Sequence, residues 1–169
     1  GGELLAAAAT LGIPHPPGYP TYTLLLRLFA TVVPVGDFAF RGNLMSAVLG
    51  ATAVALLYGA TLRLCAATAP EAPLRHRITA AALAGAVLAA SPLFWSQAVI
   101  TEVYTLNAAF IAGLLLLATR VGPRDARAGD RFTRDLPVAL FSFFLGLGLG
   151  NHLTLALVMA PMVAWMGAS

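Results

Sequence analysis

The chain has 169 residues, of which 59% are hydrophobic and only 10% are charged, whereas a soluble globular domain carries about 25% charged residues. A chain of this length cannot bury so much apolar surface in a water-soluble core, because small domains leave much of their surface exposed. The composition therefore excludes a soluble enzyme and a nucleic-acid-binding domain, and it predicts an all-α polytopic membrane protein. The formal net charge of +3 comes from ten arginines and no lysine, so the positions of the arginines carry the information.

Residues 1–41 differ from the rest, and we expect them to form an outer loop with two short helices that lie in the membrane interface. Residues 3–11 have a short helical pattern that is rich in alanine. Residues 13–20 cannot be helical, because four prolines and a glycine favour a turn or a polyproline-like stretch. Residues 21–33 predict a second apolar helix, which contains Arg27, ends before Pro34 and is too short to span a membrane easily.

The remaining residues, 42–169, form the predicted membrane domain, since a crossing helix needs about 20 apolar residues. The 42 residues from 78 to 119 hold a single charge, Glu102, and are long enough for two crossings, which Pro92 separates. The uncharged stretch after residue 135 predicts two short helices with a turn near its glycines. About five transmembrane helices are expected, at 42–64, 78–94, 97–119, 136–149 and 152–169.

Eight of the ten arginines lie in two loops, around residues 63–77 and 120–134, on one side of the predicted membrane domain. Arginine-rich loops face the cytoplasm. We therefore expect an integral protein of the cell (inner or plasma) membrane with these loops in the cytoplasm and its site facing outside. The outer side then holds Glu3, His15, Arg27, Asp37, Arg41, Glu102, Asn151 and His152.

Two outer carboxylates are the strongest candidates for chemistry. Glu3 stands in the first turn of a predicted helix, where a carboxylate stabilises the helix dipole; the alternative is a catalytic carboxylate that faces an outer cavity. Glu102 is the only charge in a long apolar stretch, and carboxylates inside membranes face a cavity or a partner. The alternative for Glu102 is an interfacial loop position beside the aromatic anchors Trp95 and Tyr104, with Asn107 at the same depth.

Two histidines and two arginines complete the candidate residues. His15 lies in the proline-rich turn, where a lone histidine is more often a hydrogen-bonding structural residue than a ligand, and His152 follows a glycine-rich helix end. With the carboxylates they would form a metal site if they converged, but no pair has metal-ligand spacing, so no residue is assigned to a metal. Arg27 and Arg41 can hold an anionic lipid phosphate or simply extend to the interface.

Five short motifs follow one another along the chain: Gly-Glu-Leu at 2–4, His-Pro-Pro-Gly-Tyr-Pro at 15–20, Arg-Gly-Asn-Leu-Met-Ser-Ala at 41–47, Glu-Val-Tyr-Thr-Leu-Asn at 102–107 and Gly-Leu-Gly-Leu-Gly-Asn-His at 146–152. In this order they resemble the N-terminal part of a bacterial membrane family of unknown function that is related to protein O-mannosyltransferases. The resemblance covers nearly the whole chain. More weakly, the chain is similar to the GT-C superfamily of polytopic glycosyltransferases.

This resemblance implies a fold in which a first transmembrane helix precedes a long outer loop with two interfacial helices. On that fold the first transmembrane helix is missing from this sequence, which would be a fragment of a longer chain and inactive alone. In the family a carboxylate in this loop is linked to catalysis, typically an Asp just upstream of the Gly-Glu pair. Glu3 is the matching acid in this sequence.

The resemblance also implies transfer of a sugar from a polyprenyl-phosphate donor to a protein or glycan acceptor on the outer face. Such a transfer needs a base for the acceptor hydroxyl and positive charge or dipoles for the leaving phosphate. Glu3 is the candidate base or base partner, and Glu102 would orient acceptor or sugar. Contacts with the substrate or the lipid phosphate are assigned to His15, Tyr19, Arg41, Tyr104, Asn107 and His152. The expected partners are membrane lipids, the lipid-linked donor and the acceptor, without nucleic acid; no cofactor is assigned, and a divalent metal requirement stays open.

A transporter or channel module that uses Glu102 as an intramembrane ion or proton site is the alternative hypothesis. It predicts Glu102 near the middle of the membrane, whereas a glycosyltransferase predicts Glu102 at the outer interface near Glu3. A non-catalytic scaffold would leave the two carboxylates far apart.

Overall fold

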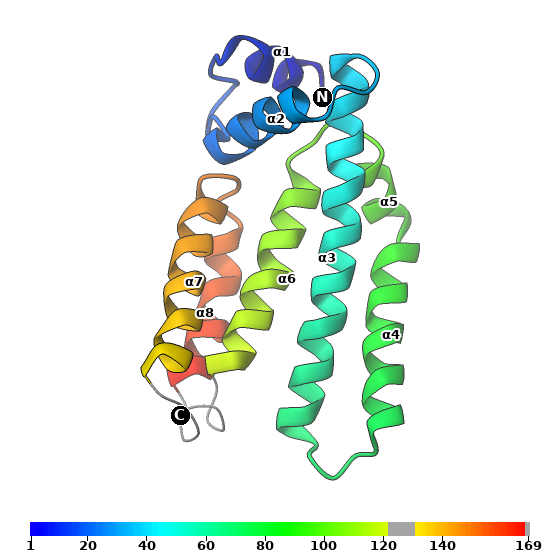
Figure 1. Ribbon diagram of the computed structural model, residues 1–169, viewed down its shortest axis with the longest axis vertical. Coiled ribbons are helices and arrows are strands. Elements are labelled where there is room, and N and C mark those ends of the chain that lie inside the picture. Colours follow the sequence, from blue (N-terminus) through cyan, green and yellow to red (C-terminus); the bar gives the residue numbers. More distant parts are fainter. Residues whose placement is uncertain (122–130, 168–169) are drawn as a thin grey trace.

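The computed structural model describes residues 1–121 and 131–167, and this part of the chain is all-helical (Figure 1). A long bundle carries a small layer of two helices across one end. In chain order the helices are α1 (Gly2–Thr10), α2 (Pro20–Val32), α3 (Phe38–Thr68), α4 (Leu74–Ala90), α5 (Pro92–Ala98), α6 (Tyr104–Val121), α7 (Arg131–Leu149) and α8 (Leu155–Gly167).

The layer consists of α1 and α2, the two short helices that the sequence predicts, with the non-helical proline-rich turn between them. Helix α1 ends at Leu11, which adopts the left-handed conformation, and the N–H of Gly12 closes the end on the carbonyl of Ala7. Helix α2 begins at Pro20, whose fixed φ suits a first helical position. Both ends are therefore set by local sequence.

The layer is attached to the bundle by a shared hydrophobic core. Leu4 of α1 and Tyr22 of α2 are buried against Met45 of α3, against Val103 just before α6 and against Leu106 in the first turn of α6. Burial of a large apolar side chain contributes about 1.5–3 kcal/mol. The position of the layer over one end of the bundle is thus fixed by packing and not only by chain connectivity.

Helix α3 is the longest element and packs against both α4 and α6 (Figure 1). Small residues allow α3 and α4 to approach closely: a methyl group added to Gly85 of α4 would come within 3.4 Å of Val54 of α3. Helix α6 also contacts α7 and α8. These contacts give the described part of the chain the form of a helical bundle with α3 and α6 at its centre.

Two helices of the described residues, α3 and α6, are long and apolar enough to cross a membrane. The pair α4 and α5 makes a third candidate if its bend of 66° lies within one broken span. The apolar parts of α7 and α8, Asp135–Leu149 and Leu155–Ala164, are shorter. The structure therefore supports an all-helical membrane protein but two or three full-length candidate spans, and not the predicted count of about five.

The lower count comes from the short apolar parts of α7 and α8 and from the bend between α4 and α5. The break at Ser91 is where Pro92 predicts it, and the Ser91 hydroxyl caps α5. The sequence pattern placed the start of α6 near residue 97, but the helix begins only at Tyr104. The residues before it form a non-helical link, which a contact of Thr101 with α3 holds in place. Residues 122–130, which contain part of the predicted arginine-rich loop, lie outside the described residues.

Candidate functional site

The elements and loops that carry the predicted outer-side residues lie at the end of the bundle that carries the α1–α2 layer (Figure 1). Three segments that are far apart in the sequence meet there: the turn between α1 and α2, the α5–α6 link, and the loop between α7 and α8. The side-chain amide of Asn151, in the loop between α7 and α8, donates a 3.2 Å hydrogen bond to the carbonyl of Val103 in the α5–α6 link. The first turn of α2 joins them, since the hydroxyl of Thr21 donates a 2.7 Å hydrogen bond to the carbonyl of Leu147 near the end of α7.

Glu3 and His15 form a two-point contact that fastens the proline-rich turn to α1. The backbone N–H of His15 donates to Oε1 of Glu3 at 2.6 Å, and the ring Nδ1 of His15 lies 2.7 Å from Oε2. The hydrogen bond from the His15 side chain, followed by that from its backbone N–H, lowers the pKa of Glu3 below its ordinary value. Glu3 is therefore a charged carboxylate, and Nε2 of His15 has no hydrogen-bond partner within the described part of the chain.

Four of the predicted substrate-binding residues form a continuous row of rings, which we call the aromatic row: His15, Tyr19, His152 and Tyr104. The Tyr19 ring meets His15 edge-on at a centroid distance of 5.5 Å and stacks on His152 at 6.2 Å. His152 in turn lies 5.7 Å from Tyr104. Tyr19 reaches this position because it adopts a left-handed conformation at the N-cap of α2, with φ of 43°.

Thr154 links the aromatic row to α6 and was not among the predicted residues. Its hydroxyl lies 2.8 Å from Nδ1 of His152 and accepts a 3.2 Å hydrogen bond from the side-chain amide of Asn107. The Thr154 backbone N–H also donates to Nδ1 of His152. A local signal in the sequence could have indicated Thr154, because it is a threonine two residues after a histidine in a glycine-rich turn.

Glu102 lies in the α5–α6 link, at the same end of the bundle as Glu3 and outside any helix. Its Oε1 accepts a 2.7 Å hydrogen bond from the main-chain nitrogen of Gly1, and its side chain is 25% exposed. The neighbouring Thr101 donates a 2.7 Å hydrogen bond to Asn43 of α3. The start of α1 thus connects the two candidate carboxylates without a direct contact between Glu102 and the Glu3–His15 pair.

Beneath this surface lies a buried polar group that sequence patterning did not single out. The hydroxyl of Tyr22 is fully buried and, like that of Ser46 close to it, has no hydrogen-bond partner in the described structure. Burial raises the pKa of the Tyr22 phenol far above its ordinary value, and the negative charge of Glu102 raises it further. Tyr22 is therefore a neutral hydroxyl close to a candidate carboxylate.

Arg27 of α2 and Arg41 of α3 are occupied by backbone carbonyls and do not join the aromatic row. Arg41 donates to the carbonyls of Ala30, Val35 and Gly36 at 2.8–3.2 Å. Arg27 donates to the carbonyl of Ala9 at 3.0 Å. Both guanidinium groups therefore satisfy carbonyls at or near the C-terminal ends of α1 and α2, where a positive charge is favoured.

Three apolar cavities, of about 420, 410 and 340 Å³, lie between the bundle helices, and none of them contains Glu3, His15 or Glu102. Within the described residues, no three histidine, cysteine or acidic side chains gather as they would around a metal ion. The candidate site therefore consists of surface groups: the Glu3–His15 pair and the aromatic row that begins at His15.

Comparison with known proteins agrees with the resemblance to O-mannosyltransferases. The chain is 36% identical over 165 residues to "Protein O-mannosyl-transferase TMEM260" of Mus musculus, an alignment that covers 98% of this chain and 22% of that protein. It is 27% identical over 172 residues to "Protein O-mannosyl-transferase tmem260" of Dictyostelium discoideum, covering 98% and 20%. The chain spans about a fifth of the length of these relatives, and no solved structure matches it. Residues 1–168 match the family described as "Protein O-mannosyl-transferase TMEM260 N-terminal domain", and the chain belongs to that family.

Proposed function

We propose that this chain forms the outer-face part of a GT-C-type membrane O-mannosyltransferase, which moves mannose from a polyprenyl-phosphate donor to a hydroxyl group of a protein acceptor. The names of its relatives and its long apolar helices support this assignment. The single observation that carries the site is the Glu3–His15 pair at one end of the aromatic row.

The reaction joins the acceptor oxygen to C1 of mannose, breaks the bond between C1 and the phosphate oxygen, and moves the acceptor proton to a base. Glu3 alone is a weak base, because its pKa is lowered and both of its oxygens already accept hydrogen bonds. We therefore assign the proton to Nε2 of His15 and the role of base partner to Glu3, which holds Nδ1 and stabilises the imidazolium that forms.

The aromatic row supplies a surface on which a sugar ring can lie. Tyr19 and Tyr104 present ring faces and hydroxyl groups, and the Thr154–Asn107 hydrogen bond fixes His152 between them. Because Arg41 is held by three carbonyls, we place the donor phosphate near His152 and Tyr104 and give Arg41 the task of bracing the layer. Glu102 then orients the acceptor or the sugar from the α5–α6 link.

The transporter hypothesis receives no support. It needs Glu102 near the middle of the helical bundle, and Glu102 lies at one end of the bundle, below the start of α1. The same position suits a group that meets substrate at the membrane surface.

The test is mannose transfer by the full-length protein in proteoliposomes, with polyprenyl-phosphate mannose and an acceptor peptide, with and without a chelator. His15→Asn keeps an amide donor close to where Nδ1 lies and so keeps the contact with Glu3, but it removes the base. We expect it to lower kcat at least about 100-fold, the lower end of the contribution of a general base. Glu3→Gln should lower kcat as well and shift its pH profile.

Glu71→Gln is the matched control, because Glu71 is an exposed carboxylate in the α3–α4 loop at the opposite end of the bundle. It should transfer mannose at the wild-type rate. Wild-type rates in His15→Asn and Glu3→Gln, for protein that elutes normally in size-exclusion chromatography, would remove this pair from the mechanism.

A further inference from the structure

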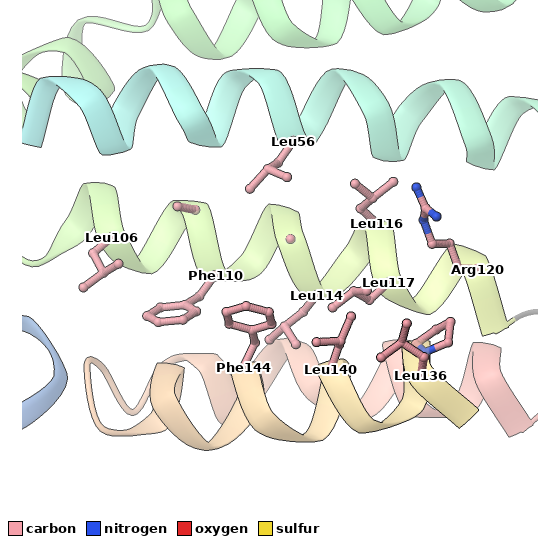
Figure 2. A pocket seen from close by; sticks show the side chains of 13 residues that line it. Leu56, Leu106, Phe110, Leu114, Leu116, Leu117, Arg120, Leu136, Leu140 and Phe144 are labelled. Atoms are coloured by element: carbon pink, nitrogen blue, oxygen red, sulfur yellow. The ribbon is translucent and has the colours of Figure 1, made fainter. Parts of the chain in front are cut away.

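An apolar groove runs between α3, α6 and α7, and neither Glu3 nor His15 lines it (Figure 2). Its volume of about 420 Å³ is typical of ligand pockets, which measure about 300–1,000 Å³. Among the residues that the structure describes, every side chain that lines it is apolar except Arg120. We call it the α6–α7 groove.

The groove follows two facing helix stripes. On α7 the lining residues Leu136, Leu140 and Phe144 recur every four positions, so they lie on one face of the helix. On α6 the lining extends from Leu106 to Arg120, a distance of about 21 Å at 1.5 Å per residue. This is more than half of the hydrocarbon core of a bilayer, which is about 30 Å thick. The groove is long enough for one extended hydrocarbon chain.

The groove is open on its α7 side and at its Arg120 end. Leu136 and Leu140 are 42% and 36% exposed, whereas Leu106, at the end nearest the candidate site, is only 4% exposed. A ligand therefore enters from the side or from the Arg120 end. The donor chain of the proposed reaction would have to enter from the opposite end.

Arg120 places one positive charge at the open end. It is exposed in the last turn of α6, and its guanidinium group has no hydrogen-bond or ion-pair partner within the described part of the chain. Figure 2 shows it at one end of the row of lining side chains. Guanidinium groups bind phosphate through paired, charge-assisted hydrogen bonds, and basic pockets between membrane helices bind anionic lipid head groups.

We propose that the α6–α7 groove binds one acyl chain of an anionic phospholipid whose phosphate contacts Arg120. The apolar lining matches the acyl chain, and Arg120, the one cation among the described lining residues, matches the head group. The phosphate contact at Arg120 lies at the end of the bundle opposite the Glu3–His15 pair, and the proposal does not depend on the proposed function.

The test is photolabelling of the full-length protein in nanodiscs that contain phosphatidylglycerol or phosphatidylcholine with a diazirine on the acyl chain. Labelled peptides are mapped by mass spectrometry. Residues 106–117 and 136–144 should be labelled about fivefold more strongly by phosphatidylglycerol, since one arginine near the membrane surface contributes about that factor toward an anionic lipid. Arg120→Gln should remove this preference.

Arg75→Gln is the matched control, because Arg75 is exposed at the same end of the bundle and does not line the groove; it should keep the preference. Leu140→Trp fills the groove and should lower labelling by both lipids. Should Leu140→Trp fail to fold, the surface variant Arg120→Gln decides alone.

Three results would overturn the proposal. Equal labelling by the two lipids would remove the role of Arg120. Displacement of the label by a polyprenyl phosphate would assign the groove to the sugar donor. Absence of label from the groove, together with cross-links from Leu140 to another segment of the full-length protein, would show that protein covers it.

Discussion

Gly42 lies where α3 meets the α5–α6 link, and a single added methyl group there tests how that link is held. The added Cβ would overlap Oγ1 of Thr101, stand 3.0 Å from its Cγ2, and lie 2.8 Å from Cδ2 of Leu5. The end of the Leu5 side chain is flexible and can move aside. Thr101 cannot move freely, because its β-branched side chain is stiff and its hydroxyl is bound to Asn43.

The magnitude follows from three terms. Overpacking of a well-packed contact costs about 1–3 kcal/mol. Loss of the Thr101–Asn43 hydrogen bond costs about 1 kcal/mol more, and the better helix propensity of alanine returns about 1 kcal/mol. The last two terms cancel, so Gly42→Ala should destabilise the protein by about 1–3 kcal/mol and displace Glu102, which follows Thr101 directly.

The assay is thermal unfolding of the full-length protein in detergent, paired with mannose transfer. Gly146→Ala in α7 is the matched control, because nothing beyond its chain neighbours and the nearby backbone of α7 lies within 4 Å of its added Cβ in the described structure; it should keep or slightly raise Tm. Gly42→Ala should lower Tm and reduce transfer. Equal Tm values for the two variants would refute the close approach of Thr101 to α3.

Three further predictions concern the ends and loops of the helices. The hydrogen bonds from His15 lower the pKa of Glu3. The attachment of the proline-rich turn to Glu3 should therefore be complete above pH 4.5, the ordinary pKa of the carboxyl group, and should be lost as the pH falls through the lower pKa of the folded protein. Protease cleavage of the turn measured against pH should show this loss, and Glu3→Gln should be cleaved at all pH values. Asp37→Ala should cost about 1 kcal/mol by removing the N-cap of α3, whereas Asp37→Asn, which keeps a capping oxygen, should unfold close to the wild-type Tm. Asn151→Ala should cost about 1 kcal/mol, since it removes one hydrogen bond to the carbonyl of Val103, which keeps the one from the backbone N–H of Asn107; a wild-type Tm would show that the contact of Asn151 is not formed.

Local sequence predicts the elements of this chain well. The proline-rich turn, the two short helices beside it, the break at Ser91 and the turn before residue 155 each depend on proline, glycine or capping side chains within a few positions. Hydropathy also indicates correctly that the helices are apolar. It overestimates the number of full-length candidate spans, because the apolar parts of α7 and α8 are short and the span formed by α4 and α5 is bent. It also places the start of α6 too early, because it cannot register that Thr101 holds residues 99–103 in a non-helical link through a contact with Asn43, far along the chain.

The candidate site is harder to predict from local sequence and hydropathy. Glu3 and His15 are twelve positions apart, and nothing in their spacing requires them to meet. The carbonyls that occupy Arg41 belong to the end of α2 and the following turn, so its guanidinium group looks free in the sequence and is bound in the structure. Tyr22 lies in a helix that reads as apolar, and only packing reveals its buried hydroxyl near Glu102.

The central claim is that the Glu3–His15 pair and the aromatic row handle the sugar. A cryo-EM structure of the full-length protein with polyprenyl-phosphate mannose tests it most directly. The account predicts mannose density against the rings of Tyr19 and His152, with Nε2 of His15 facing C1 across the space for the acceptor oxygen. Mannose density at the opposite end of the bundle, or at any place where neither Tyr19 nor His152 touches it, would contradict the account.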